Sequence, residues 1–208
     1  MANSMVHWNG CHCCAIDVET TGLDPKFHEV IQVAAIPLDS NFNVRRDVLP
    51  LQLLIKPERP ELIDSKVLKL TGLRQEALAK GFDKFKAIDL LEAWIDKLGL
   101  PHNSSGYNRC KIIPLGFNYA FDRGFLQAWL GDLYDEWFHH QYRDPMIVAN
   151  FLNDQASVHA EPAVHPKMNL QGMCQRVGIE LSRAHDALQD ALATARLYRY
   201  MTSQGMII

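Results

Sequence analysis

The sequence predicts an α/β protein in which helices pack on a mixed β-sheet. Segments with strand composition come first, up to about residue 56, and the remainder mixes helical patterns with one more short apolar strand. This order is typical of a mixed sheet covered by helices. No repeat, low-complexity tract or linker divides the 208 residues. We therefore expect a single domain, residues 1–208, with a core from about 13 to 201.

Four apolar segments predict strands, at residues 13–19, 29–38, 48–56 and 111–117. The link between the first two is short and contains Gly22 and Pro25, which predicts a hairpin. The third segment contains Pro50. Because proline cannot donate a hydrogen bond to a neighbouring strand, we expect this segment to lie at an edge of the sheet or to begin near Leu51.

Five segments predict helices, at residues 64–72, 85–98, 118–130, 170–177 and 187–202. The first has an N-cap residue in Asp64 and a stopping glycine in Gly72. Residues 99–109 and 153–167 are rich in polar and turn-forming residues, so we expect loops there.

The composition is that of a globular protein, with 48% hydrophobic and 22% charged residues. No apolar run approaches membrane-spanning length, and the first residues lack a signal-peptide pattern. We therefore expect a cytoplasmic protein without membrane contact. The net charge of −3 gives no overall attraction to nucleic acid, so binding to it would depend on metal ions and local basic residues.

The five cysteines are odd in number, and three crowd at Cys11, Cys13 and Cys14, which does not resemble a disulfide framework. No second ligand pair stands at a zinc-like spacing. We interpret these cysteines as small buried residues, with zinc as the minor alternative. Solvent-exposed side chains are expected at His139, His140, His159 and His165, and core packing at Trp129 and Trp137.

Two carboxylates stand two residues apart inside the first strand, at Asp17 and Glu19. Positions i and i+2 of a strand face the same side, about 7 Å apart. Two like charges on a core strand are costly unless something positive neutralises them. A divalent metal held by oxygen ligands is the simplest neutraliser.

A third carboxylate, Asp122, falls in the first turn of the helix that follows the apolar segment 111–117. Helix starts at strand ends are common places for site residues. The helix dipole also favours a negative charge there, so simple capping is the alternative reading of Asp122.

The last constellation is His185, Asp186, Gln189 and Asp190. Asp186 followed by Gln189 has the form of a capping box, which would start the helix at Ala187 and leave His185 just outside it. Asp190 lies on a largely apolar stripe of this helix, where an aspartate usually has a partner. An ordinary acid near a helix start remains the alternative for Asp186.

Three motifs together resemble the DEDDh family of 3′–5′ exonucleases. The pattern D-x-E-T-T-G matches residues 17–22, N-x-x-F-D matches residues 118–122, and H-x-x-x-x-D matches residues 185–190. The resemblance implies a ribonuclease-H-like fold, a mixed five-stranded sheet flanked by helices. It also implies two Mg²⁺ or Mn²⁺ ions and release of 5′-nucleoside monophosphates.

Phosphodiester hydrolysis needs an activated water and a stabilised leaving oxygen, which two metals about 4 Å apart supply. With the family pattern, we assign the metal ligands as Asp17, Glu19, Asp122 and Asp190. His185 is assigned as general base, because the ordinary pKa of histidine, about 6.5, suits proton transfer at neutral pH.

The resemblance also assigns the contacts of the terminal nucleotide to Thr20, Thr21, Gly22, Leu23, Asn118 and Phe121. Leu23 is expected to wedge against the last base, and the alternative is that it packs on the core as a turn residue. Phe121 is also open to a core role. Four scattered cations are candidates for phosphate contacts, although solvated surface is their default: Arg123, Arg143, Lys167 and Arg183.

The expected function is removal of nucleotides from the 3′ end of single-stranded DNA or RNA, with DNA slightly favoured and roles in DNA replication or repair. The alternatives are an exoribonuclease of the ribonuclease T or oligoribonuclease type, and a proofreading subunit whose main role is binding a polymerase. A non-catalytic module with the same fold is a further competitor, disfavoured by the complete set of acids and histidine. A polymerase partner and a homodimer are both left open.

Overall fold

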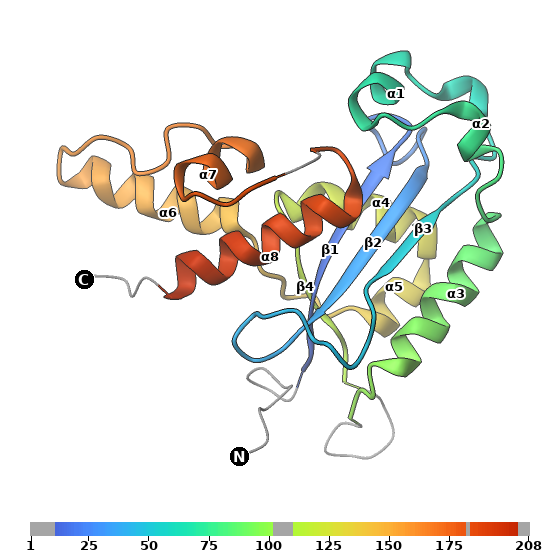
Figure 1. Cartoon of the computed structure of the whole chain (residues 1–208), viewed down its shortest axis with the longest axis horizontal. Helices are drawn as coiled ribbons and strands as arrows, with labels where there is room; N and C mark the ends of the chain where they lie inside the picture. The colour runs from blue at the N-terminus through green and yellow to red at the C-terminus, as the bar shows by residue number, and fades with distance from the viewer. Residues whose placement is uncertain (1–10, 102–109, 182–183, 204–208) are drawn as a thin grey trace.

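The computed structural model describes residues 11–101, 110–181 and 184–203. Its sheet has the order β3-β2-β1-β4, with β1 at Cys13–Thr20, β2 at Val30–Leu38, β3 at Leu51–Leu54 and β4 at Ile113–Leu115. The pairs β1–β2 and β2–β3 are antiparallel, and β1–β4 is parallel. The predicted hairpin is present, and β3 lies at an edge beginning at Leu51. The mixed sheet flanked by helices is confirmed (Figure 1).

The number of strands differs from the five that the resemblance implied, because the described residues form four. Residues 138–143 lie where a fifth strand would pair. They meet the chain around β4 through two isolated parallel bridges, Ile112 with Phe138 and Leu115 with Arg143. Between these bridges one side advances three residues and the other five, so the register is lost and no continuous ladder forms.

The helices are α1 (Ser65–Thr71), α2 (Gln75–Leu78), α3 (Lys84–Lys97), α4 (Tyr119–Leu130), α5 (Asp132–Trp137), α6 (Pro145–Val158), α7 (Leu170–Arg176) and α8 (Ala187–Ser203), with a 3-10 turn at Pro60–Leu62. All five predicted helices are present. Helix α1 has the expected ends: the Asp64 side chain accepts a hydrogen bond from the Lys66 N–H, and Gly72 takes the left-handed conformation with φ of 68°. Helices α2, α5 and α6 were not predicted.

The expected loop at 153–167 is wrong in its first third, where α6 continues to Val158. Asp144 caps this helix and Pro145 occupies its first turn. Its buried face includes the small residues Ala149 and Ala156, which give a weak hydrophobic period. His165 is buried instead of exposed, because its backbone N–H donates to Asn153 Oδ1 at 2.7 Å and fixes the following turn.

Side-chain alternation along β1 divides the core into two layers. Cys14, Ile16 and Val18 pack with residues of α3 and α4 on one face of the sheet. Cys13 and Ala15 pack on the other face with residues of α8. Figure 1 shows α8 crossing the near face while α4 lies behind the strands. The sheet is therefore covered on both sides.

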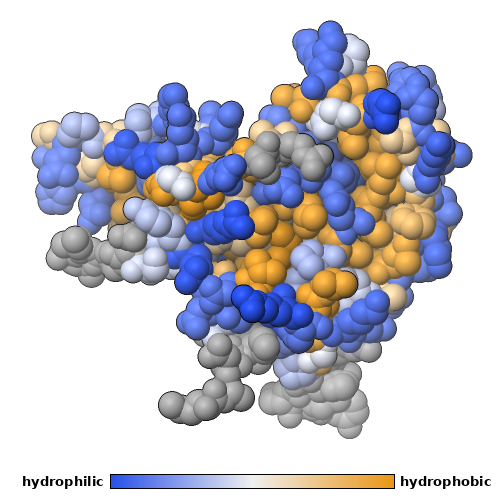
Figure 2. Space-filling view, viewed as in Figure 1, coloured by the Kyte–Doolittle hydropathy of each residue, from blue (hydrophilic) through white to orange (hydrophobic). Residues whose placement is uncertain are grey.

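Hydrophilic residues line the outer side of α8, whereas hydrophobic residues show at the surface beside it, over the part of the sheet where β2 and β3 lie (Figure 2). Among the described residues, no helix is both long enough and apolar enough to cross a bilayer.

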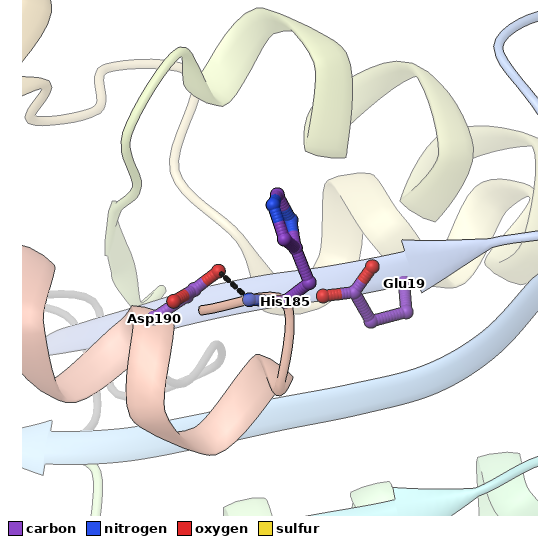
Figure 3. Close-up of side chains that lie close together, drawn as sticks. All are labelled: Glu19, His185 and Asp190. Carbon is purple, nitrogen blue, oxygen red and sulfur yellow. Dashed lines mark hydrogen bonds between the residues drawn. The ribbon is translucent and has the colours of Figure 1, made fainter. Parts of the chain in front are cut away.

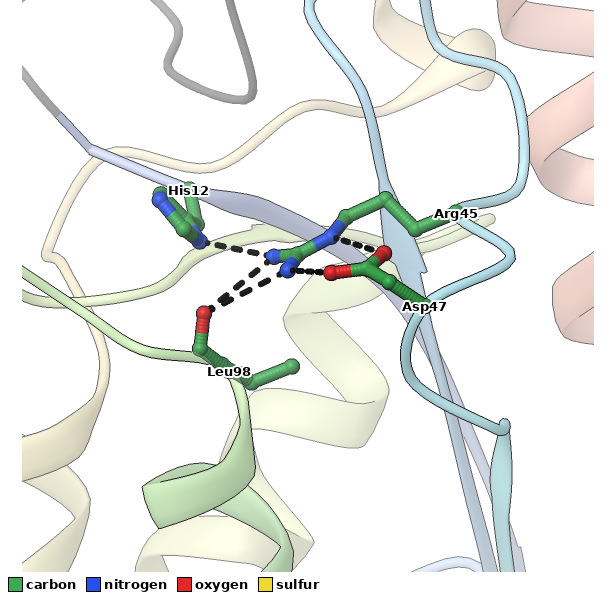
Figure 4. A network of polar contacts seen from close by, with 4 residues as sticks. All are labelled: His12, Arg45, Asp47 and Leu98. Carbon is green, nitrogen blue, oxygen red and sulfur yellow. Dashed lines mark hydrogen bonds and ion pairs between the residues drawn. The ribbon is translucent and has the colours of Figure 1, made fainter.

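A buried arginine ties the ends of several elements together at the opposite end of the sheet from the tip of β1 (Figure 4). Arg45 makes two hydrogen bonds to Asp47, at 3.1 and 2.6 Å. Its Nη1 also contacts His12 Nδ1 at 3.0 Å and the carbonyl of Leu98 at 3.4 Å. Because Leu98 closes α3, the guanidinium neutralises carbonyl charge at that helix end. This network is structural support for the fold.

Candidate active site

The candidate site lies where β1 extends past its neighbour β4. The ladder with β4 ends at Ala15, whereas β1 continues to Thr20. Past Ala15 this side of β1 is open, and the Val18 N–H donates to Asp122 Oδ1 at 2.9 Å. Asp122, at the start of α4, therefore takes the place of a neighbouring strand at the edge of β1.

Asp17 and Glu19 project from the α8 face of β1, as the alternation of the strand predicted. Both are half-buried, and their partners across the ladder are Ala34 and Gln32 on β2. The small side chain of Ala34 leaves room beside Asp17. The Gln32 side chain points to α8, where its Oε1 accepts a hydrogen bond from the Ala187 N–H at 3.0 Å.

Four hydrogen bonds satisfy the N–H groups at the start of α8. Gln32 accepts from Ala187, and Asp186 Oδ1 accepts from the N–H groups of Leu188 and Gln189 at 3.2 and 3.4 Å. The Asp190 N–H bonds to the Asp186 carbonyl at 2.9 Å. The helix begins at Ala187 with Asp186 as its cap, as the capping-box pattern predicted.

This start brings three predicted site residues together (Figure 3). One ligand atom from each of Glu19, His185 and Asp190 lies within 4.8 Å of the other two. His185 has a left-handed backbone, with φ of 63°, and its N–H donates to Asp190 Oδ2 at 3.0 Å. Its imidazole rises between the carboxylates of Asp190 and Glu19.

Asp17 and Asp122 belong to the same electrostatic cluster. Burial raises the pKa of Asp17 well above its usual range, and the charges of Asp122, Glu19 and Asp190 add to the shift. Burial raises the pKa of Glu19 to about 8, with Asp190 and Asp122 as further causes. Four carboxyl groups thus disfavour one another's charge within one site.

The carboxyls on the two helices show the same effect. Burial raises the pKa of Asp122 to about 8, although its hydrogen bond from Val18 opposes the rise. Burial also raises the pKa of Asp190, against the hydrogen bond from His185. Asp190 Oδ1 is buried without a hydrogen-bond partner among the described residues. An unsatisfied carboxylate oxygen in an acidic pocket suits a hard cation. The donor set therefore fits a divalent metal.

One residue that the sequence reasoning missed holds the start of α4. Asp144 is 5% exposed, and its Oδ2 accepts from the Tyr119 N–H at 3.0 Å. Its Oδ1 accepts from the N–H groups of Asn118 and Met146, at 3.1 and 2.8 Å. One carboxylate thus caps α4 and α6 together. The signal in the sequence was an aspartate before a proline, typical of a helix start, but it does not reveal the second helix.

The loop after β1 places the predicted substrate residues in two different environments. Thr20 and Thr21 are buried: Thr20 Oγ1 donates to the Gly22 carbonyl at 2.6 Å, and Thr21 Oγ1 accepts from the Glu29 N–H at 2.9 Å. A side chain at Gly22 would overlap the ring of His28, so the turn needs glycine there. Leu23 is 83% exposed, and the alternative that it packs on the core is wrong.

At the start of α4, Asn118 is exposed and has a left-handed backbone with φ of 57°. Phe121 is half-buried, and its ring packs on Phe125 at 4.9 Å. Of the candidate phosphate contacts, Lys167 is exposed and Arg123 and Arg143 are half-buried. None of these three is among the residues placed together around Glu19. Arg183 lies outside the described residues.

The chain resembles known nucleases in sequence. An exonuclease family model, RNase_T, matches residues 14–108. The PolC-type DNA polymerase III of Thermotoga petrophila is 28% identical over 183 residues, which is 88% of this chain and 11% of that protein. The oligoribonuclease of Vibrio campbellii is 28% identical over 139 residues, which is 62% of this chain and 68% of that protein. This chain thus spans about a tenth of the length of the polymerases it matches.

Solved structures share the fold. The nuclease domain of 3′hExo, a DEDDh family member bound to rAMP, has a TM-score of 0.63 at 19% identity, covering 96% of each chain. E. coli exonuclease I in complex with a 5cy-dT13 oligonucleotide has a TM-score of 0.69 at 20% identity, covering 94% of this chain and 41% of that one. The mixed sheet and its helices therefore have the ribonuclease-H-like fold that the resemblance implied.

The three motifs and these comparisons agree. The exonuclease family model matches the part of the chain that carries the first motif, and the predicted resemblance to the DEDDh exonucleases is confirmed. Its cluster of two acids and a histidine suits a divalent metal ion.

Proposed function

We propose that this protein is a metal-dependent exonuclease that removes nucleotides from the 3′ end of single-stranded nucleic acid. The observation that carries the proposal is the convergence of Glu19, His185 and Asp190 within 4.8 Å, in the electrostatic field of Asp17 and Asp122. A stable protein rarely gathers so many acids in a partly buried place without a cationic partner.

Asp17, Glu19, Asp122 and Asp190 would hold two divalent cations, Mg²⁺ or Mn²⁺. Such a pair, when bound, activates the attacking water and stabilises charge on the leaving oxygen. Both cations prefer carboxylate oxygens. The unsatisfied Asp190 Oδ1 and the upward pKa shifts of these carboxyls support this assignment.

His185 would act as the general base. In the proposed step, water adds to the phosphorus of the last phosphodiester and its proton passes to a ring nitrogen of His185. The bond to the 3′-oxygen of the preceding nucleotide breaks, and a 5′-nucleoside monophosphate leaves. The hydrogen bond from the His185 N–H to Asp190 fixes the backbone, so the imidazole can stay between the carboxylates of Glu19 and Asp190.

The terminal nucleotide would lie between the loop after β1 and the start of α4. Leu23 is exposed at that loop and suits a wedge against a base. Phe121 offers part of a ring and Asn118 an amide at the other wall. Thr20, Thr21 and Gly22 would shape the backbone of the loop. DNA is the favoured substrate, because the match to the PolC-type polymerases covers more of this chain than the match to oligoribonuclease.

The test uses 5′-labelled DNA and RNA strands of one sequence with Mg²⁺. We expect a ladder of products that shortens from the 3′ end, with faster shortening of DNA. Asp17→Ala should abolish the ladder, whereas Lys97→Gln, at an exposed position of α3, should leave it unchanged. Internal cuts, or undiminished cleavage by Asp17→Ala, would refute the proposal. Faster cleavage of short RNA would instead favour the oligoribonuclease-type alternative.

Residues 1–208 would form one nuclease domain. The likeness to part of a PolC-type polymerase supports association with a polymerase. A pull-down of a replicative polymerase by the purified chain, measured with and without DNA, would test that association.

A further inference from the structure

A pocket of about 240 Å³ lies on the face of the sheet that packs with α3 and α4, opposite the face from which Glu19 projects. Its walls come from that loop, from the chain after β3, from the start of α3 and from the outer part of α4. The apolar part of its lining includes Pro25, Val30, Ile55, Phe125 and Trp129. Pro25 approaches α4 at Gly124, so the loop and the helix meet at the pocket.

Three lysines stand around this pocket, Lys26, Lys56 and Lys84. Lys26 and Lys56 are exposed and Lys84 is half-buried. In the described part of the chain none of the three ammonium groups pairs with a carboxylate, whereas Arg59 pairs with Glu29 at 3.3 Å. With Glu29 and Arg59 paired, the lining has three lysines against the one carboxylate of Glu58, so in a chain of net charge −3 this pocket is a local positive surface. Such a surface attracts an anionic ligand.

Exposed phenylalanines alternate with these lysines. Phe27 is 60% exposed and follows Lys26, and Phe85 is 73% exposed and follows Lys84. Phe82 is also exposed. The Lys56 N–H bonds to the Phe82 carbonyl at 2.8 Å, so the third aromatic lies beside the third lysine. Large aromatic rings left in water next to cations are unusual unless they have a ligand.

We propose that this surface, the lysine–phenylalanine patch, binds the single strand on the 5′ side of the nucleotide that is removed. The patch consists of Lys26, Phe27, Lys56, Phe82, Lys84 and Phe85. Ammonium groups that follow a phosphate backbone, interleaved with rings on which bases stack, are the usual means of binding single strands without sequence preference. An acidic peptide would use the lysines but has no need of three exposed rings.

The position of the patch fits this ligand, and the inference rests on the proposed function. Its loop begins directly after Glu19 and Thr20, and its helix carries Asp122. From Asp122 to Trp129 α4 advances about 10 Å, a distance that a few nucleotides can span. A strand with its 3′ end at the acidic site can therefore reach the patch around the exposed loop. The patch then makes affinity depend on strand length.

Binding is measured in EDTA, by fluorescence anisotropy with labelled dT15 and dT3. We expect dT15 to bind the wild-type chain far more tightly than dT3. The triple variant K26Q/K56Q/K84Q should weaken dT15 binding, and the slope of log Kd against log salt should fall by about 2, near 0.7 for each lost phosphate contact. The double variant F27A/F85A should weaken dT15 binding at least about tenfold with the slope unchanged.

Matched controls are K97Q and F151A, which remove an exposed lysine at the end of α3 and an exposed phenylalanine on α6. Both should bind dT15 within about twofold of the wild type. If the lysine variant matches K97Q in affinity and slope, the patch does not bind nucleic acid. If F27A/F85A matches F151A, or if polyglutamate competes as well as dT15, the site is not a stacking surface and the proposal fails.

A kinetic arm separates this inference from the proposed function. With Mg²⁺, the ratio of kcat/KM for dT15 to that for dT3 should fall at least about tenfold in both patch variants, mainly through KM. An unchanged ratio would overturn the role of the patch in length preference. Failure of the wild type to cleave either strand would refute the nuclease proposal, while the anisotropy result would still decide whether the patch binds a strand.

Discussion

Helices α4 and α8 each carry an aspartate in their first turn, and the contacts that hold these two aspartates differ. Asp122 and Asp190 are each the fourth residue of their helix, and each carboxylate accepts one backbone N–H. A residue with positive φ stands near each start, Asn118 directly before α4 and His185 two residues before α8. Two helix starts of similar form therefore bring their acids to one strand.

The difference lies in the origin of the partners. At α8 most of them are local: Asp186 caps the helix and the N–H of His185 reaches Asp190. At α4 they are distant: Asp144 supplies the cap and Val18 supplies the N–H. A site built from local contacts can be read from a sequence motif, whereas one built from distant contacts depends on the whole fold.

The largest expected effect tests whether the two acids are equivalent. Asp122→Asn and Asp190→Asn retain an oxygen for the backbone N–H but remove the charge. Each should lower kcat at least about a hundredfold and abolish the rise in Tm that Mn²⁺ gives the wild type. Without metal, both variants should be at least as stable as the wild type, because burial and like charges oppose the ionised carboxyl. These predictions are checked by calorimetry with and without Mn²⁺, and by initial rates.

A variant that keeps more than a tenth of the activity would show that its helix contributes no essential ligand. If this holds for one helix alone, the similarity of the two starts does not extend to function.

The next effect concerns the residues with positive φ. His185→Ala should lower kcat by about 10²- to 10⁴-fold through loss of the general base, while the Tm rise with Mn²⁺ stays nearly that of the wild type. Asn118→Ala changes the residue with positive φ that precedes α4 and should act mainly on KM, since Asn118 is assigned to substrate. Equal loss of turnover and metal response in His185→Ala would identify His185 as a ligand or a structural residue.

Because Asp144 caps α4 from a distant part of the chain, we expect Asp144→Ala to lower the free energy of unfolding strongly. The buried carboxylate serves three backbone N–H groups on two helices, so its removal should cost about 2–4 kcal/mol. Urea unfolding gives the measurement, and Asp83→Ala at the exposed cap of α3 is the control, with an expected loss of about 1 kcal/mol. A loss no larger than that of the control would mean that water replaces Asp144.

The sequence supports prediction where the physics is local or periodic. Alternation in β1 correctly placed Asp17 and Glu19 on one face, and the spacing of Asp186 and Gln189 correctly began α8 at Ala187. These features depend on contacts within a few residues of the chain. The hairpin between β1 and β2 follows from a short link that contains glycine and proline for the same reason.

Prediction failed where the partner is far away in the chain. Gln32, which caps α8 from β2, gave no signal because glutamine in an apolar strand has no fixed partner. Asp144 was missed for a similar reason, since its second helix begins 25 residues earlier, at Tyr119. The described residues form no fifth strand, because the chain between Phe138 and Arg143 has too many residues for the register of β4. This mismatch appears only when both segments are placed.

The smallest expected effect concerns the local cap. Asp186 is half-buried and accepts long hydrogen bonds from Leu188 and Gln189, at 3.2 and 3.4 Å. Gln52 of β3 also donates to it at 3.2 Å. Because water can reach these groups and Gln32 still caps Ala187, Asp186→Ala should cost about 1 kcal/mol in urea unfolding, clearly less than Asp144→Ala. If instead the two losses are equal, the contrast between local and distant capping does not describe how this site is held.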